Sequence, residues 1–416
     1  MGNVLDLAER AWQGSLDSMQ VHPGNALVDF EELGPDLGFM SAFSNVGVLD
    51  TDEGLVFLDT SSFFHAAQLH EKVRRWSPKR VHTAVFTHGH VDHVFGLVPF
   101  EQEAREHKQP ATHVIAHENC PARFERYRLT NGYNGYINAR QFGFPEPTFP
   151  KKFREPDQTI REQLALEIGG CRIELCHDRG ETDDHLWAWI PEKRALYTGD
   201  LFIWASPNCG NPQKVQRYPR EWAHAFRRMM DLNAELLMPG HGPPIIGAAR
   251  VRQALDESAQ LLETIVEQTL KFMNLGARLD DVMQSVKIPE DLLARPYLRP
   301  VYDDPRFIIR NLWRLYGGWW DLNPAHLLPA PERDLACALA AVAGGAAALA
   351  RAADAQAADN RLDLACHLVE LAMAADADAA GVRESAAAIY AARAQAETSL
   401  MAKGVFRLAA RDAGGE

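Results

Sequence analysis

The segment 87–93, with the sequence THGHVDH, concentrates four side chains that bind metals: His88, His90, Asp92 and His93. Alternate residues of an extended chain project to the same side, so His88 and His90 can hold one ion. Asp92 and His93 follow them and can turn toward a second ion. Imidazole and carboxylate groups together suit Zn²⁺ or Fe²⁺ better than Mg²⁺. The spacing therefore predicts a site for two transition-metal ions.

Between about residue 25 and residue 245, short β-branched runs alternate with helical stretches, as layered α/β folds require. Catalytic groups often lie where strands deliver loops to one edge of a sheet, and the strand ends here are rich in His and Asp. We expect strands at 54–60, 81–88, 112–117, 164–178 with a break at Gly169-Gly170, 185–190, 194–200 and 235–241. After Pro243-Pro244, apolar residues recur at three- and four-residue steps, which predicts helices and a domain boundary near residue 245.

Composition and charge argue against several classes of protein. The chain of 416 residues has a formal net charge of −13 and scattered basic residues, so we expect no nucleic-acid partner. No apolar run is long enough to cross a bilayer, so we expect no membrane span. The N-terminal sequence lacks the basic start and apolar core of a secretory signal, which favours a cytoplasmic location.

The THGHVDH segment resembles in full the HxHxDH signature of the metallo-β-lactamase superfamily. The resemblance implies an αββα sandwich with a two-metal site at one edge, and a hydroxide between the ions as the nucleophile. The YTGD stretch at 197–200 looks like the superfamily's SGD stretch, which implies that Asp200 bridges both metals. MPGHGPP at 238–244 resembles the superfamily's PGHGP and implies His241 as the last ligand of the second metal.

Where most members of the superfamily carry a histidine, this chain has Glu181 in RGETDDH. A carboxylate at that position should lower the Lewis acidity of the first metal and raise the pKa of water bound to it. His177 and His185 are nearby alternatives, but the place of Glu181 in the motif favours it as the ligand. The ligand set implied by the resemblance is His88, His90, Asp92, His93, Glu181, Asp200 and His241.

The alkyl sulfatase branch of the superfamily also has Glu at this position, nineteen residues ahead of the bridging carboxylate, as Glu181 is ahead of Asp200. That branch usually has Glu, within an AEN motif, where this chain has Asp200. GGWWDLNPAHLLPAP at 317–331 resembles the branch's dimerisation domain. The resemblance implies a catalytic domain over 1–245, an all-α dimerisation domain over 246–416 and a homodimer. It does not include the branch's C-terminal sterol-carrier-like domain.

Two further segments resemble parts of the branch that contact substrate. In NPQKVQRYPREWAHAF at 211–226, Arg217 stands five residues before Trp222, where the branch has a sulfate-binding arginine. A guanidinium can bind two oxygens of a tetrahedral anion at once, although an exposed arginine at a helix start is the alternative. The segment 117–144 resembles a pocket-lining segment, with Tyr133, Tyr136 and Arg140 as candidates. Loop tyrosines are often packing residues, which is the alternative for these.

We therefore expect a binuclear hydrolase of small sulfuric esters, of the alkyl sulfatase type, with two Zn²⁺ ions, or iron or manganese in their place. Asp92 and Asp200 are the expected catalytic carboxylates: Asp200 would set the separation of the metals and Asp92 would position one of them. A metallohydrolase of a carboxylic ester, lactone or phosphoester is the alternative. A third hypothesis, a noncatalytic metal-binding dimer, is disfavoured because the ligand set is complete.

Overall fold

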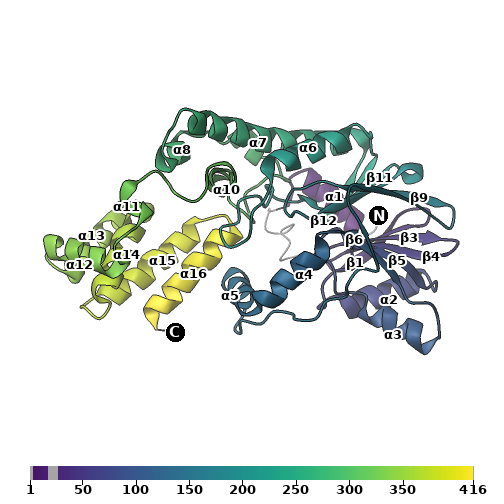
Figure 1. Cartoon of the computed structure of the whole chain (residues 1–416), viewed down its shortest axis with the longest axis horizontal. Coiled ribbons are helices and arrows are strands. Elements are labelled where there is room, and N and C mark those ends of the chain that lie inside the picture. The colour runs from purple at the N-terminus through teal and green to yellow at the C-terminus, as the bar shows by residue number, and fades with distance from the viewer. Residues whose placement is uncertain (1–2, 17–26, 416) are drawn as a thin grey trace. The chain divides into compact units, whose positions relative to one another are not determined.

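The protein is described by a computed structural model covering residues 3–16 and 27–415, and it divides into two compact units (Figure 1). The sandwich unit comprises Met1–Asn131, Phe149–Leu275 and Val282–Tyr316. The helical unit comprises Gly132–Thr148, Gly276–Asp281 and Gly317–Glu416. The candidate metal ligands all belong to the sandwich unit.

The described part of the sandwich unit contains two β-sheets. The first has seven strands in sequence order, antiparallel from β1 to β4 and parallel from β4 to β7. Its strands are β1 (Asp29–Gly34), β2 (Leu37–Ser41), β3 (Val46–Thr51), β4 (Gly54–Leu58), β5 (Val81–Val85), β6 (His113–His117) and β7 (Gln158–Ile160).

The second sheet has six described strands, in the order β13-β12-β11-β10-β9-β8. All neighbours are antiparallel except β11 and β12, which are parallel. The strands are β8 (Gln163–Ile168), β9 (Cys171–His177), β10 (Leu186–Ile190), β11 (Ala195–Ile203), β12 (Leu236–His241) and β13 (Ile245–Ile246). The turn between β8 and β9 requires glycine, because Gly169 and Gly170 have φ values of +51° and +80°.

The two sheets face each other across one hydrophobic core. Phe39, Val56 and Val85 of the first sheet share this core with Ile173 and Tyr197 of the second. Helices cover the outer faces: α2 and α3 lie against the first sheet, and α6 and α7 lie on the side of the second (Figure 1). The expected αββα sandwich is therefore confirmed.

The helices of the sandwich unit follow the apolar periodicity of the sequence. In α7, buried side chains recur at three- and four-residue steps from Val251 to Thr269, and the helix packs on α6. The helices are α1 (Asn3–Trp12), α2 (Ala66–Trp76), α3 (Val98–Glu106), α4 (Cys120–Leu129), the 3₁₀ helix η3 (Pro191–Lys193), α6 (Pro219–Met230), α7 (Ala248–Asn274), α9 (Glu290–Leu293) and α10 (Pro305–Gly317). The expected division into 1–245 and 246–416 stays a prediction.

The helical unit contains no strand among its described residues, which confirms the expected all-α region. Small side chains let its helices approach closely, and its core includes Ala353, Ala365, Val369 and Ile389. Its helices are α5 (Asn131–Phe142), α11 (Pro324–Leu327), α12 (Glu332–Ala343), α13 (Ala346–Ala358), α14 (Leu362–Asp376), α15 (Val382–Ala396) and α16 (Leu400–Gly414), and α8 (Leu279–Ser285) crosses between the units.

No single helix within residues 3–16 and 27–415 is long and apolar enough to cross a membrane. The helices α12 and α13 reach the length and apolar composition of a membrane-spanning segment only when they are counted together, and the chain bends by 81° between them.

Candidate metal centre

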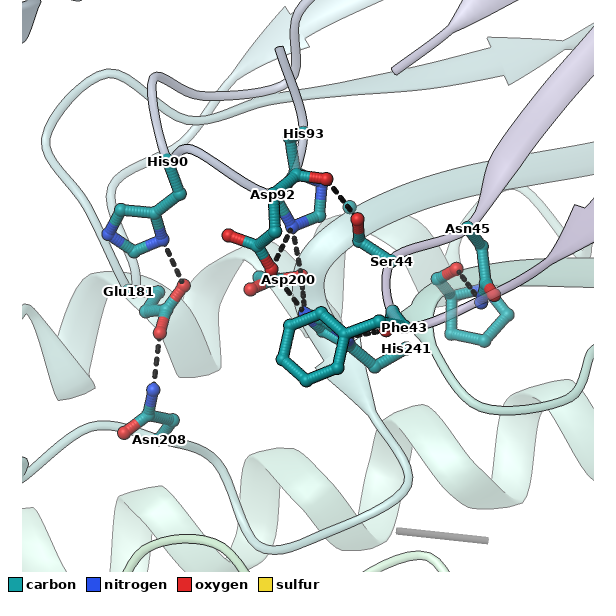
Figure 2. Close-up of polar contacts among 12 residues, drawn as sticks. Phe43, Ser44, Asn45, His90, Asp92, His93, Glu181, Asp200, Asn208 and His241 are labelled. Atoms are coloured by element: carbon teal, nitrogen blue, oxygen red, sulfur yellow. Dashed lines mark hydrogen bonds and ion pairs between the residues drawn. The ribbon is translucent and has the colours of Figure 1, made fainter. Parts of the chain in front are cut away.

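The loop that follows β5 carries His88, His90, Asp92 and His93 to one edge of the sandwich. Three further residues from distant segments meet this loop: Glu181 after β9, Asp200 within β11, and His241 at the end of β12. The structure thus brings together all seven side chains of the expected ligand set, in two groups. Figure 2 labels His90, Asp92, His93, Glu181, Asp200 and His241.

The first group consists of His88, His90, Glu181 and Asp200, whose ligand atoms lie within 4.8 Å of one another. His88 Nε2 lies 2.8 Å from His90 Nδ1, 3.6 Å from Glu181 Oε2 and 3.8 Å from Asp200 Oδ2. His90 Nδ1 lies 3.3 Å from Glu181 Oε2. A tetrahedral site with bonds of about 2.1 Å has edges of about 3.4 Å, close to most of these separations.

The second group consists of Asp92, His93 and His241. Asp92 Oδ2 lies 3.5 Å from the Nε2 atom of each histidine. Asp200 Oδ1 lies 3.2 Å from both Nε2 atoms, whereas its Oδ2 faces His88 of the first group. One carboxylate therefore presents a separate oxygen to each group, as a carboxylate shared by two ions would.

The polar atoms of the site fit bound cations. His93 Nε2, Glu181 Oε2 and Asp200 Oδ1 are buried and have no hydrogen-bond partner of good geometry in the described structure. Leaving buried polar atoms without partners costs about 1–3 kcal/mol each, and more for charged groups. Metal ions would satisfy all three atoms, and the mixed imidazole and carboxylate donors suit zinc, iron or manganese.

The electrostatics of the site also favour cations. Burial alone would raise the pKa of Asp200, but His241 and His93 hold it well below its usual range. Burial alone would lower the pKa of His93, but Asp200, Asp59 and Asp92 raise it well above its ordinary value. Positive charge is therefore stabilised where the carboxylates converge, and divalent ions would supply it.

Asp59, at the end of β4, orients the metal-binding loop. Its carboxylate accepts hydrogen bonds from Thr87 N at 2.7 Å, Thr87 Oγ1 at 2.9 Å and His93 Nδ1 at 2.8 Å. The last bond leaves His93 Nε2 facing the second group. Asp59 was not predicted from the sequence, although the polar end of the predicted strand 54–60 was a signal that pointed to it.

We expect Asp59→Asn to weaken binding of the second ion about 10- to 100-fold, the usual range for a partner that orients a ligand. The amide can donate to His93 and so permits the wrong tautomer. Metal content and zinc affinity measured by competition with a chelator would test this. Unchanged affinity in a folded variant would show that Asp59 does not orient His93.

Backbone contacts fix other ligands. His241 Nδ1 donates to Phe43 O, and Asn45 Nδ2 donates to Pro239 O at 2.9 Å and to Gly242 O at 2.8 Å (Figure 2). The turn that carries His241 is therefore held by the segment before β3, whose role was not predicted from the sequence.

Arg123 and Asp184 brace the loop between His88 and His90. Arg123 Nε donates to Asp184 Oδ1 at 2.8 Å, and Asp184 Oδ2 accepts from Gly89 N at 2.9 Å. Because both side chains are buried, this ion pair is strengthened by its surroundings and fixes the loop backbone. Neither residue was predicted from the sequence.

Glu181 occupies the place in the first group for which His177 and His185 were considered. His185 Nε2 instead accepts from Asp200 N at 3.1 Å, and His177 Nδ1 bonds to His185 O at 2.9 Å. Glu181 Oε1 contacts Asn208 Nδ2 and Arg217 Nη1, leaving Oε2 directed at His90 (Figure 2). The geometry thus favours Glu181 over either histidine.

The expected substrate-binding residues lie in both units. Arg217 belongs to the sandwich unit, is buried, and also contacts Asn208 O. Tyr133 and Tyr136 lie on α5, a helix rather than the expected loop, and are 64% and 63% exposed. Arg140 lines a cleft of about 510 Å³ within the helical unit, together with Arg407 and Arg411. Their substrate-binding roles stay predictions.

Comparison with known proteins identifies both parts of the chain. Residues 42–241 match the family model of the metallo-beta-lactamase superfamily, and residues 278–415 match that of alkyl sulfatase dimerisation. The chain is 25% identical over 324 residues to a linear primary-alkylsulfatase of Pseudomonas sp. (strain ATCC 19151), covering 72% of this chain and 60% of the relative. It is also 25% identical over 336 residues to the alkyl/aryl-sulfatase BDS1 of Saccharomyces cerevisiae, covering 74% of this chain and 52% of the relative.

The chain thus spans about half to three-fifths of the length of these curated relatives. Among solved structures, the stereoselective inverting sec-alkylsulfatase Pisa1 of Pseudomonas sp. superposes with a TM-score of 0.85 at 20% identity. The match covers 98% of this chain and 70% of that chain. At this identity, the likeness establishes the fold.

Proposed function

This chain belongs to the metallo-β-lactamase superfamily, in the branch that carries an alkyl sulfatase dimerisation domain, and we propose that it is a metal-dependent hydrolase of small sulfuric esters. The observation that carries the proposal is the pair of ligand groups sharing Asp200, in a chain whose relatives include alkylsulfatases. A complete ligand set argues against a noncatalytic protein.

We propose two zinc ions, with iron or manganese as alternatives. His88, His90 and Glu181 would hold the first ion, Asp92, His93 and His241 the second, and Asp200 both. When bound, two such ions supply the nucleophile by lowering the pKa of a shared water to about 7. Asp200 would set the separation of the ions, and Asp92 would position one of them.

The surroundings of Glu181 bear on catalysis. Its carboxylate adds negative charge to the first group, and Arg217 compensates part of that charge through their ion pair. Arg217 is also predicted from the sequence to bind the sulfate group, which its Nε, without a hydrogen-bond partner in the described part of the chain, would permit. The sulfate-binding role is part of the proposal.

An activity panel on zinc-loaded protein tests the proposed reaction. We expect turnover of a medium-chain alkyl sulfate well above that of a carboxylic ester, a lactone and a phosphodiester of matched chain length. Turnover of one of them with alkyl sulfates untouched would refute the sulfatase assignment and leave the metal site in place.

We expect Arg217→Ala to lower kcat/KM for alkyl sulfate about tenfold or more, with a smaller effect on metal content. The expected cause is loss of a charge-assisted hydrogen bond to the anion. Metal analysis and kinetics on the same preparations, with Arg217→Lys as the conservative control, would measure both. Metal loss equal to the activity loss would give Arg217 a structural role as the partner of Glu181.

We also propose a homodimer formed through the dimerisation domain. Leu335, Leu339 and Val342 on α12 are 55%, 41% and 89% exposed, at helical spacings of four and three residues. Leu328, just after α11, is 91% exposed. An apolar helix face of this kind suits a second copy of the chain.

A further inference from the structure

The segment 207–218 lies between β11 and α6 and contains no helix or strand. The buried backbone groups of such a segment need partners outside the regular ladders, usually side chains or water. Asn208 and Arg217, near its two ends, are buried, and both contact Glu181 Oε1. The position of this segment therefore decides which donors reach Glu181. We call it the Glu181 loop.

Asn311, on α10, holds the Glu181 loop near both of its ends. Its side-chain Nδ2 donates to Cys209 O at 2.8 Å and to Arg217 O at 2.9 Å. Cys209 directly follows Asn208, so each bond fixes the backbone beside a residue that contacts Glu181. The side chain is also buried, with an exposed fraction of 8% for the residue. A single amide thus ties together the two parts of the loop that reach Glu181.

Two neighbouring side chains fix the orientation of the Asn311 amide. Gln216 Nε2 donates to Asn311 Oδ1 at 2.8 Å, and Arg314 Nε donates to Gln216 Oε1 at 3.1 Å. Because Oδ1 is already engaged as an acceptor, Nδ2 is the group that faces the two carbonyls. The donor is therefore held in the direction that the loop requires.

The Glu181 loop also meets the first turn of α10. The buried Asp303, just before this helix, accepts a hydrogen bond from Gly210 N at 2.8 Å. A Cβ on Gly210 would lie 2.4 Å from Ile308 N, so glycine is needed for the loop to approach the helix this closely. Contacts with α10 and the residues before it thus set the path of the loop.

The consequence for Glu181 is that its two oxygens have different surroundings. Asn208 and Arg217 both contact Oε1, whereas Oε2 lies 3.3 Å from His90 Nδ1 and 3.6 Å from His88 Nε2. The guanidinium thus compensates charge on the oxygen that does not face the histidines. Holding both donors in place keeps one defined oxygen directed at the first ligand group.

We infer that Asn311 is a positioning residue for the first ligand group, an inference that rests on the proposed metal centre. By holding the carbonyls of Cys209 and Arg217, it keeps Asn208 and Arg217 on one oxygen of Glu181. Side chains that orient a ligand without touching the ion change metal affinity by about 10- to 100-fold. Asn311 acts one step further out, through the backbone of the loop.

Competition with a chelator measures the affinity for each zinc ion and does not require turnover. We expect Asn311→Ala to raise the Kd of the first ion about tenfold and to leave that of the second ion largely unchanged. Glu181→Gln identifies the first ion, because Glu181 belongs to that ligand group alone. Adding Asn311→Ala to Glu181→Gln should raise the Kd much less than adding it to the wild type, since the two residues act in series.

Three further variants separate positioning from general destabilisation. Val73→Ala truncates a fully buried side chain on α2, so it should lower the Tm of the zinc-free protein and leave both zinc affinities unchanged. Asn311→Asp keeps the shape of the side chain but loses both donated hydrogen bonds, and it should weaken the first ion as Asn311→Ala does. If Asn311→Ala does not fold, Gln216→Met at a partly exposed position removes the amide that orients Asn311 and decides the question in its place.

Unchanged affinity for the first ion in the folded variant would overturn the inference. Equal weakening of both ions, or a full additional effect in the Glu181→Gln background, would also overturn it, because a residue that acts through Glu181 produces neither. The wild type decides the proposed metal centre separately. Two bound zinc ions that Asn311→Ala leaves unaffected would refute the role of Asn311 alone, whereas a wild type that takes up no zinc would refute the centre and the inference together.

Discussion

Replacing His88 and His90 together by alanine should remove about one metal ion per chain and abolish hydrolysis. These two histidines supply half of the first ligand group, and Glu181 and Asp200 alone cannot complete a tetrahedral site. The second ion should remain bound, because its ligands Asp92, His93 and His241 do not belong to the first ligand group. Elemental analysis of the purified variant, with activity on the same preparation, would measure both effects.

The matched control is His82→Ala with His113→Ala, which removes two histidines from β5 and β6 away from both ligand groups. This control should keep two ions and full activity. Retention of both ions by the His88 and His90 variant would show that the metal site lies elsewhere. Loss of both ions would show instead that the two groups bind metal as one cooperative unit.

Much of the centre could be predicted because its ligands sit in short local patterns. His88, His90, Asp92 and His93 lie within six positions, so their spacing alone indicates a metal-binding loop. Asp200 and His241 end predicted strands, and Glu181 was placed by its motif. The structure brings these residues together, while their roles as ligands stay predictions.

The residues that hold the ligands in place could not be found in the same way. Asp59 reaches His93 because β4 lies beside β5. Asn311, on α10, reaches the backbone carbonyls of Cys209 and Arg217 because that helix packs close to them. Such contacts depend on tertiary packing, which the local sequence does not specify, although Asp59 does lie at the polar end of a predicted strand.

Two elements of the fold, β1 and α5, were not predicted from the sequence. β1 has the sequence DFEELG, whose charged residues obscure the apolar alternation of a strand, and it lies at the edge of its sheet. α5 begins with Asn131 and contains Gly132 and Gly135, which have low helix propensity, so its segment was expected to be a loop. Tertiary context overrides local preference at both places.

Asp200→Asn should deprive the protein of both ions, whereas Asp92→Asn should remove only the second. Asp200 presents Oδ2 to His88 and Oδ1 to His93 and His241, so the two sites share its charge. Asparagine keeps the shape of the side chain but removes that charge, and its amide nitrogen cannot ligate an ion. Asp92 belongs to the second ligand group and not to the first, so its replacement leaves the first set complete.

Zinc content and the zinc-dependent rise in Tm, measured side by side, separate the two variants. Ligand binding to the native state stabilises it by RT ln(1 + [L]/Kd), so a variant that binds no zinc should show no rise. Asp92→Asn should retain about one ion per chain and part of the Tm rise, and Asp200→Asn should retain neither. If Asp200→Asn kept one ion as Asp92→Asn does, Asp200 would serve a single site and the two ions would not share a carboxylate.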